Sequence, residues 1–197
     1  MQLTATIDRA TLSELLREVT PLRVKLGSAT QDRFFTIEPP SLIEFLPARG
    51  VRLRTQAHVQ WSVAGVAIPL TLESATFVLI PSLAPAPEAG KLVFELKLEQ
   101  LDLKNVPKMI ESTLVPLIND GLAALDKPLG WDFAKTLTHR FAISPKAAPL
   151  AAFTLATGRS SLEVTADAIV LSLALEMHFE TTNPAPAAAN RPATSSS

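Results

Sequence analysis

Residues 105–125, NVPKMIESTLVPLINDGLAAL, carry the pattern on which the expected fold depends. Apolar side chains recur there at steps of three and four residues, which places them on one face of an α-helix. Asn105 is a good N-cap residue, and Pro107 falls in the first turn, where its missing N–H costs little. Pro116 interrupts the hydrogen-bond ladder and predicts a kink. The stretch therefore predicts a helix of about 30 Å, at 1.5 Å per residue, as the organising element of the domain.

Alternation of apolar and polar residues predicts antiparallel strands on both sides of this helix. It is clearest over 51–63, where Val51, Leu53 and Val59 fall on one face and arginine and glutamine side chains fall on the other, as in a half-buried strand. A change of parity at Gln100 indicates a β-bulge. Further strands are expected at 3–7, 66–72, 77–80, 92–98, 141–143, 153–155 and 162–179, with a turn at 158–161.

A first, shorter helix is expected to start at Asp8 or at Thr11, since Thr11 and Glu14 fit a capping box, and to end at Pro21. Helices and strands do not alternate along the chain, which argues against a parallel doubly wound sheet. The expected class is therefore α+β, an antiparallel sheet with a long central α-helix and a shorter N-terminal helix. Residues 1–180 are expected to form one domain, and 181–197, rich in Ala, Pro, Ser and Thr, a disordered tail.

Composition narrows the range of partners. Hydrophobic residues make up 47% of the chain and the mean hydropathy is +0.25, which is high for a water-soluble protein of this size. Either the core is unusually large or apolar surface is reserved for a ligand. Eighteen basic and nineteen acidic residues give a net charge of −1, so we expect neither nucleic acid nor an anionic membrane as a partner.

Residues that would support catalysis or metal binding do not form a recognisable pattern. The chain has no cysteine, and its seven glycines are scattered, so thiol chemistry and a phosphate-binding loop are not expected. His58 and His178 fall on the solvent side of their strands. Asp132 precedes His139 at a spacing that suits a His–Asp pair, but no nucleophile accompanies them. We therefore expect no catalytic residue, no metal ligand and no cofactor, and a protein that is not an enzyme.

The N-terminal residues have neither the basic region nor the apolar stretch of a secretory signal, and no apolar run is long enough to span a bilayer. The chain as given is therefore expected to be soluble and cytoplasmic, or periplasmic if a signal has been removed.

Two segments resemble a known family. The run LKNVPKM at 103–109 leading into TLVPLIN at 113–119, together with IDRATLSELL at 7–16, is similar to the small bacterial relatives of the tubular lipid-binding (TULIP) superfamily, and most to their single-module lipoproteins. The resemblance implies a strongly curved antiparallel sheet wrapped around the long helix, with an apolar groove between them. Those lipoproteins carry a signal sequence and a lipidated cysteine, which this chain lacks, so periplasmic anchoring does not carry over.

The apolar content, the striped helix and the resemblance together predict binding of a lipid or other hydrophobic ligand, as a carrier, in a groove between the long helix and the sheet. The alternative is a non-catalytic structural or protein-interaction module with a self-packed core. A channel of several hundred cubic ångströms along 109–118 favours the first function, and close packing there favours the second. The residues expected to line the groove are Met109, Ile110, Leu114, Leu117, Ile118, Trp61, Phe94, Leu171 and Leu173.

Overall fold

A computed structural model describes residues 1–27, 33–63, 66–85, 90–102, 108–125, 129–143 and 150–182. For some helix and strand residues, Trp61, Met109 and Ile110 among them, it describes the backbone but not the side chain. The elements in chain order are β1 (Gln2–Asp8), α1 (Arg9–Val19), β2 (Leu22–Lys25), β3 (Phe34–Ile37), β4 (Leu42–Leu46), β5 (Gly50–Val63), β6 (Val66–Leu83), β7 (Lys91–Asp102), α2 (Lys108–Ala123), β8 (Leu129–Asp132), α3 (Phe133–Leu137), β9 (His139–Ile143), β10 (Leu150–Val164) and β11 (Ala168–Thr182).

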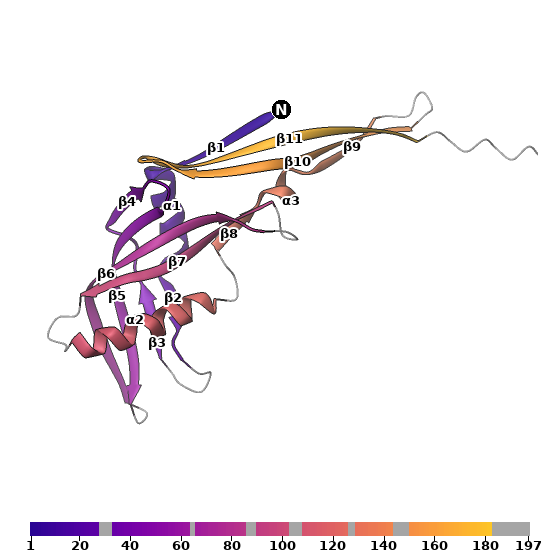
Figure 1. The fold of residues 1–197 in the computed structure, drawn as a ribbon. Helices are drawn as coiled ribbons and strands as arrows, with labels where there is room; N and C mark the ends of the chain where they lie inside the picture. Colours follow the sequence, from indigo (N-terminus) through magenta and orange to yellow (C-terminus); the bar gives the residue numbers. More distant parts are fainter. Residues whose placement is uncertain are drawn as a thin grey trace, which may run out of the picture.

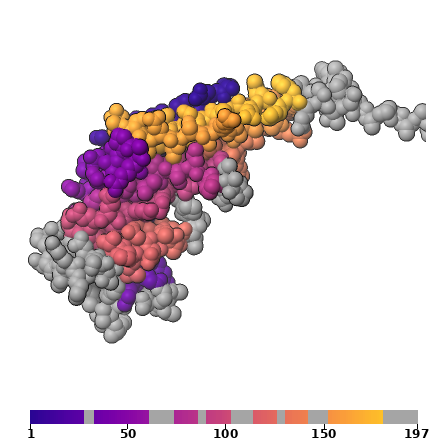
Figure 2. All heavy atoms as spheres, in the orientation of Figure 1, coloured from indigo at the N-terminus to yellow at the C-terminus, as the bar shows by residue number. Residues whose placement is uncertain are grey.

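The described strands form two antiparallel sheets. The first has four strands in the order β1-β11-β10-β9, and the second has seven, in the order β2-β3-β5-β6-β7-β8 with β4 also paired to β5. In Figure 1 the four-stranded sheet is the upper layer, and the seven-stranded sheet lies below it with α2. The far ends of β9, β10 and β11 extend beyond the rest of the molecule (Figures 1 and 2).

The strand patterns read from the sequence are largely confirmed. Val51, Leu53 and Val59 of β5 are buried, and the alternate residues of that strand face solvent or its margin. The bulge predicted at Gln100 is present, because Gln100 pairs with Thr76 while Leu98 pairs with the next residue, Phe77. Glu99 is thus the extra residue on β7.

Three details of the strand prediction are wrong. The two strands expected over 66–80 are one continuous strand, β6. The turn expected at 158–161 is a register irregularity within β10, and the chain reverses at 165–167 instead. The tail was expected from 181, but β11 continues to Thr182, and 183–197 lie outside the described residues. Glycine and polar residues occur both in turns and on long strands, so the sequence alone does not distinguish the two structures. Pairing with a neighbouring strand decides which one forms.

Helix α1 begins where the first of the two expected starts placed it. Asp8 is its N-cap, and the Asp8 carboxylate accepts a hydrogen bond of 2.8 Å from the Thr11 backbone N–H. The capping box at Thr11 and Glu14 is therefore wrong, since Thr11 lies inside the helix. Leu12 and Leu16 turn into the main apolar core, while other apolar side chains of α1 stay half-exposed.

The expected α+β class with a long central helix is wrong, and the molecule is mostly β. Helix α2 has 16 residues, and residues 103–107 lie outside the described part. It lies against one side of the seven-stranded sheet and is not enclosed by a single wrapped sheet (Figure 1). Leu114, Ile118 and Leu122 are buried, whereas Pro116 and Asp120 are exposed. An apolar stripe on a helix is buried by contact with a single surface. The pattern therefore does not distinguish a helix that packs on one side of a sheet from a helix that a sheet surrounds.

Helix α2 contacts two strands that are far apart in the order of the seven-stranded sheet, β7 on one side and the end strand β2 on the other. On the β7 side, the Leu98 N–H donates to Asn119 Oδ1 at 2.8 Å, and Asn119 Nδ2 donates to the Leu98 carbonyl at 3.2 Å. On the β2 side, a Cβ added to Gly121 would stand 2.8 Å from the Lys25 carbonyl oxygen. The Asn119 amide thus bonds to β7 as a neighbouring strand would. On the opposite side of α2, Gly121 allows the helix to approach β2 closely.

We predict that Asn119→Ala lowers the free energy of unfolding by about 1–3 kcal/mol, because the Leu98 N–H and carbonyl lose their partner in a partly buried place. Urea denaturation followed by circular dichroism measures the loss. Asp120→Ala is the matched control, since Asp120 is exposed and adjacent; it is expected to change stability by less than about 0.5 kcal/mol. Equal effects of the two variants would contradict the role given to Asn119.

Candidate functional site

An open apolar hollow runs between α1 and the paired strands β7 and β8, and we name it the α1 groove. Its volume is about 350 Å³, which falls within the range of small-molecule sites. Eleven residues line it, all but two of them apolar side chains: Ile7, Leu12, Leu15, Leu16, Glu18, Val19, Leu79, Leu92, Phe94, Gly130 and Trp131.

The helix wall of the α1 groove is unusual because it exposes large apolar side chains. Leu15 is 45% exposed and Val19 is 40% exposed, and their spacing of four residues places them one above the other on the helix surface. Leu12 and Leu16, beside them, are buried. The apolar face of helix α1 is therefore wider than the part of it that packs against the core.

The opposite wall is formed by β7 and β8. Leu92 pairs with Trp131 and Phe94 with Leu129 across the two strands, and Trp131 is held in place by an indole N–H bond of 3.2 Å to Thr136 Oγ1. The Trp131 ring also meets Phe133 edge to face, with centroids 5.9 Å apart. An aromatic side chain is thus oriented beside the groove by partners outside it.

Gly130 keeps this wall flat. A Cβ at Gly130 would stand 2.7 Å from the Leu92 carbonyl oxygen, closer than van der Waals contact allows. A glycine is therefore required for β8 to lie against β7 at this point.

A second hollow, of about 380 Å³, lies between the C-terminal half of α2 and the outer edge of β7, and we name it the α2 groove. Phe94 lines both grooves and stands between them. The α2 groove is more polar, because Glu95, Lys97, Asn119 and Asp120 contribute to its lining. Of the two, the α1 groove is better suited to an alkyl chain.

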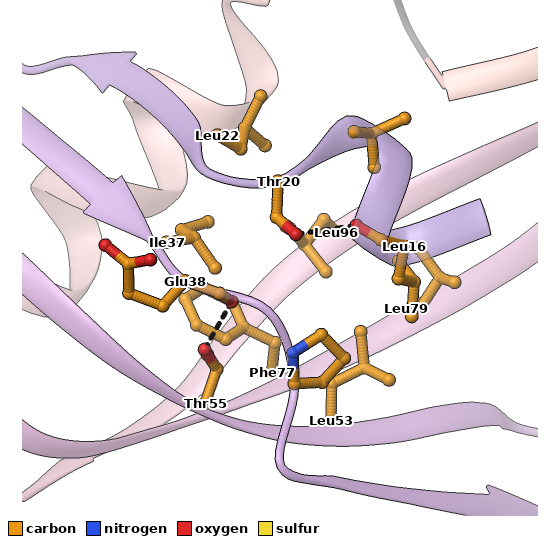
Figure 3. Close-up of a pocket in the computed structure, with 12 residues that line it drawn as sticks. Leu16, Thr20, Leu22, Ile37, Glu38, Leu53, Thr55, Phe77, Leu79 and Leu96 are labelled. Carbon is orange, nitrogen blue, oxygen red and sulfur yellow. Dashed lines mark hydrogen bonds between the residues drawn. The ribbon is translucent and has the colours of Figure 1, made fainter. Parts of the chain in front are cut away.

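The interior between the grooves is closely packed. A cavity of about 30 Å³ remains there, enough for about one water molecule. Figure 3 shows its walls, with Leu16, Leu79 and Phe77 on one side and Leu22 and Ile37 on the other. Thr55, a buried polar residue, donates its hydroxyl to the Glu38 carbonyl at its margin. A hydrophobic ligand therefore has room in the grooves but not in this interior.

The residues predicted to line a groove are spread over three places. Leu114 and Ile118 are buried in the main core, and Leu117 packs against it. Leu171 and Leu173 are buried in a second core, against Phe133 and Leu92 under the four-stranded sheet. Phe94 lines both grooves, whereas the side chains of Met109, Ile110 and Trp61 lie outside the described part. Contact of any of these residues with a ligand stays a prediction.

The sequence interpretation did not assign Leu15, Val19, Leu92 or Trp131, all of which line the α1 groove, to a ligand site. One signal was present: of the four apolar residues Leu12, Leu15, Leu16 and Val19 that fall at helical spacing, only Leu12 and Leu16 are buried in α1. No local pattern in the sequence shows that β8 brings Trp131 to the groove beside α1.

Several charged side chains form ion pairs in the described part of the chain, and three of these pairs are connected: Arg49 with Glu99, Glu99 with Arg52, and Arg52 with Glu44. His58 lies 3.7 Å from Glu38 and His178 lies 3.6 Å from Glu176, and both histidines are exposed, as expected. His139 is beside Phe141. Among the described residues no group of three or more metal-ligating side chains comes together, and no described helix is long and apolar enough to cross a membrane.

A second apolar surface lies at the projecting end of the four-stranded sheet. Phe141, Phe153 and Phe179 stand directly opposite one another on β9, β10 and β11, with ring centroids 5.6 and 5.3 Å apart. Phe141 is 51% exposed and Phe179 is 70% exposed. On β11 the same face is fully buried at Leu173, so the surface is a continuation of the core that the rest of the molecule does not cover.

Comparison with known proteins adds no family to this description, since no family model and no curated protein matches the chain. The resemblance to the TULIP superfamily therefore stays a prediction.

The N-cap of α1, the helix that forms one groove wall, makes the stability of the protein depend on pH. Hydrogen bonds from the Thr11 backbone N–H, and secondarily from its side chain, hold the pKa of Asp8 below the ordinary 3.8. A depressed pKa in the folded protein stabilises it above the unfolded value, and this contribution is lost as pH falls through the folded value.

We predict that Asp8→Ala lowers the Tm at pH 7 and that the difference from the unmodified protein shrinks as pH falls below 3.8. Asp8→Asn is the control, because asparagine caps as well as aspartate but does not titrate; its advantage over Asp8→Ala should persist at low pH. Thermal unfolding between pH 2.5 and 7 measures both. A constant gap between Asp8→Ala and the unmodified protein would contradict the prediction.

Proposed function

We propose that this protein binds a hydrophobic small molecule or a single lipid chain in the α1 groove and acts by binding, without catalysis. The observation that supports the proposal is the exposure of Leu15 and Val19 opposite Phe94 and Trp131, across a hollow of about 350 Å³. A ligand there would remove these side chains from water on both walls. The proposal therefore places the ligand in the α1 groove and not in the groove expected between the long helix and the sheet.

The mechanism follows from desolvation. Each methylene group taken out of water contributes about 0.8 kcal/mol, and the lining offers few polar groups to orient a ligand. Affinity would therefore grow with chain length, and recognition of the chain would be loose. The walls are joined to the body by buried leucines on both sides, so the groove is formed before the ligand arrives.

We predict that the full chain binds the neutral probe N-phenyl-1-naphthylamine saturably and that Leu15→Gln weakens this binding about fivefold. The estimate corresponds to about 1 kcal/mol for losing half the burial of a leucine. Leu42→Gln is the matched control: Leu42 is 49% exposed, close to the 45% of Leu15, but it lies on β4 and does not line the groove. Probe fluorescence measures both constants.

Trp131 offers an independent readout of the same event. The chain has two tryptophans, so Trp61→Phe leaves Trp131 as the only emitter, and its spectrum should shift to shorter wavelength when dodecyl-chain ligands fill the groove. Unsaturable probe binding, or equal losses in Leu15→Gln and Leu42→Gln, would reject the proposed function.

A second candidate function is protein interaction, and the exposed ladder of Phe141, Phe153 and Phe179 favours it. The three rings lie in register, so a second copy related by a twofold axis presents the same flat surface in return. We infer a second copy of this chain as the occupant, bound to the end of the sheet that extends beyond the body (Figure 2).

We predict that sedimentation velocity shows a dimer at micromolar concentration and that Phe179→Ser shifts it to monomer while leaving the Tm nearly unchanged, because Phe179 is 70% exposed. Leu42→Ser is the control, since Leu42 is 49% exposed but lies on β4, in the other sheet. A monomer at every concentration would reject this interface.

A further inference from the structure

Three of the four charged residues among the described lining of the two grooves are acidic, Glu18, Glu95 and Asp120, and the fourth is Lys97. Glu18 is the one charged residue among the described lining of the α1 groove, and it stands in the last turn of α1. Glu14, one helical turn before it and also exposed, adds a second negative charge on the same side of the helix. Arg17, the basic residue of that turn, is not among the lining residues.

The α2 groove does not supply a free cation either. Its described charged lining is Glu95, Lys97 and Asp120, and Lys97 Nζ lies 3.0 Å from Glu95 Oε1. The lysine is thus already paired with a carboxylate, and Asp120 leaves the lining with an acidic balance. An anionic head group placed at either groove would meet carboxylates.

The end of the helix works in the same direction. Helix α1 ends at Val19, beside Glu18, and its last carbonyl groups carry the partial negative charge of a helix C-terminus. The Thr20 N–H and hydroxyl both bond to a single carbonyl, that of Leu16. Glu18 and the end of α1 therefore form a negative rim at one end of an apolar groove.

We propose that the ligand of the α1 groove is a single-chain amphiphile with a cationic ammonium head group, its chain between α1 and the β7–β8 wall and its head group at Glu18. This inference rests on the proposed function, since it requires that the groove binds an alkyl chain. It excludes fatty-acid anions as preferred ligands, because a carboxylate at the rim would be repelled by Glu18 and would find no basic partner in the described lining.

The test compares two probes with the same chain, dodecylammonium and dodecanoate, by displacement of N-phenyl-1-naphthylamine from the full chain at low ionic strength and below micelle concentrations. Dodecylammonium is expected to bind about tenfold tighter, from one attraction gained and one repulsion avoided at an exposed site. Raising the salt concentration should reduce the preference.

Variants at Glu18 locate the preference. Glu18→Gln is expected to bring the ratio of the two dissociation constants close to 1, and Glu18→Lys to reverse it. Glu163→Lys, on an exposed residue of β10 outside both groove linings, makes the same change in net charge and should leave the ratio unchanged. Circular dichroism confirms that each variant is folded.

The outcomes separate the two proposals. Equal binding of the two probes, tighter binding of dodecanoate, or an unchanged ratio in Glu18→Lys would overturn the head-group assignment while leaving chain binding in the groove intact. Displacement by neither probe, together with no saturable binding of N-phenyl-1-naphthylamine, would overturn both.

Discussion

The outer edge of β7 is the constraint on which the rest of the molecule depends. Its first four residues pair with β8, and at Leu98 the amide of Asn119 takes the place of a neighbouring strand. Unpaired edge groups are costly where water is excluded, so both elements are required. Because β8 and α2 cover separate parts of the edge, a gap remains between them, and both grooves open beside Phe94 in that gap.

The two layers explain where the high apolar content goes. One core lies between α1, α2 and the seven-stranded sheet, and a second lies under the four-stranded sheet around Phe133. Both explanations considered for the composition therefore hold in part: the cores are extensive, and further apolar side chains remain exposed on α1 and at the projecting end of the upper sheet. These two surfaces are distinct in shape, since the first is a hollow with two walls and the second is a flat ladder of rings.

The proposed binding site combines apolar walls, which accept many alkyl chains, with a negatively charged rim, which selects the head group. Apolar walls distinguish ligands by length and width, and a methylene more or less changes the free energy by under about 1 kcal/mol. Charge at the entrance separates ligands that the walls treat alike, since the same carboxylate attracts one head group and repels another. Glu18 lies at the end of the groove because α1 ends at the next residue, Val19. The length of this helix therefore determines where the negative rim lies.

Local pattern determined most of the strands, the start of α1 near Asp8, the bulge beside Gln100 and the existence of α2. Each of these follows from interactions among residues close in sequence: alternation, capping and apolar steps of three and four. The polar turn signal at 158–161 failed because pairing with β11 keeps that segment extended.

Only the tertiary structure decided that α2 covers a sheet edge instead of forming a centre, and that Trp131 faces α1 across a groove. Both arrangements depend on contacts between distant parts of the chain. Leu98 bonds to Asn119 at the β7 edge, and Leu15 and Trp131 line the same groove. The apolar stripe of 105–125 predicts a helix with one apolar face. Which surface covers that face depends on contacts between residues far apart in the chain. For that physical reason the sequence determined the elements, and the fold decided where hydrophobic surface is left open.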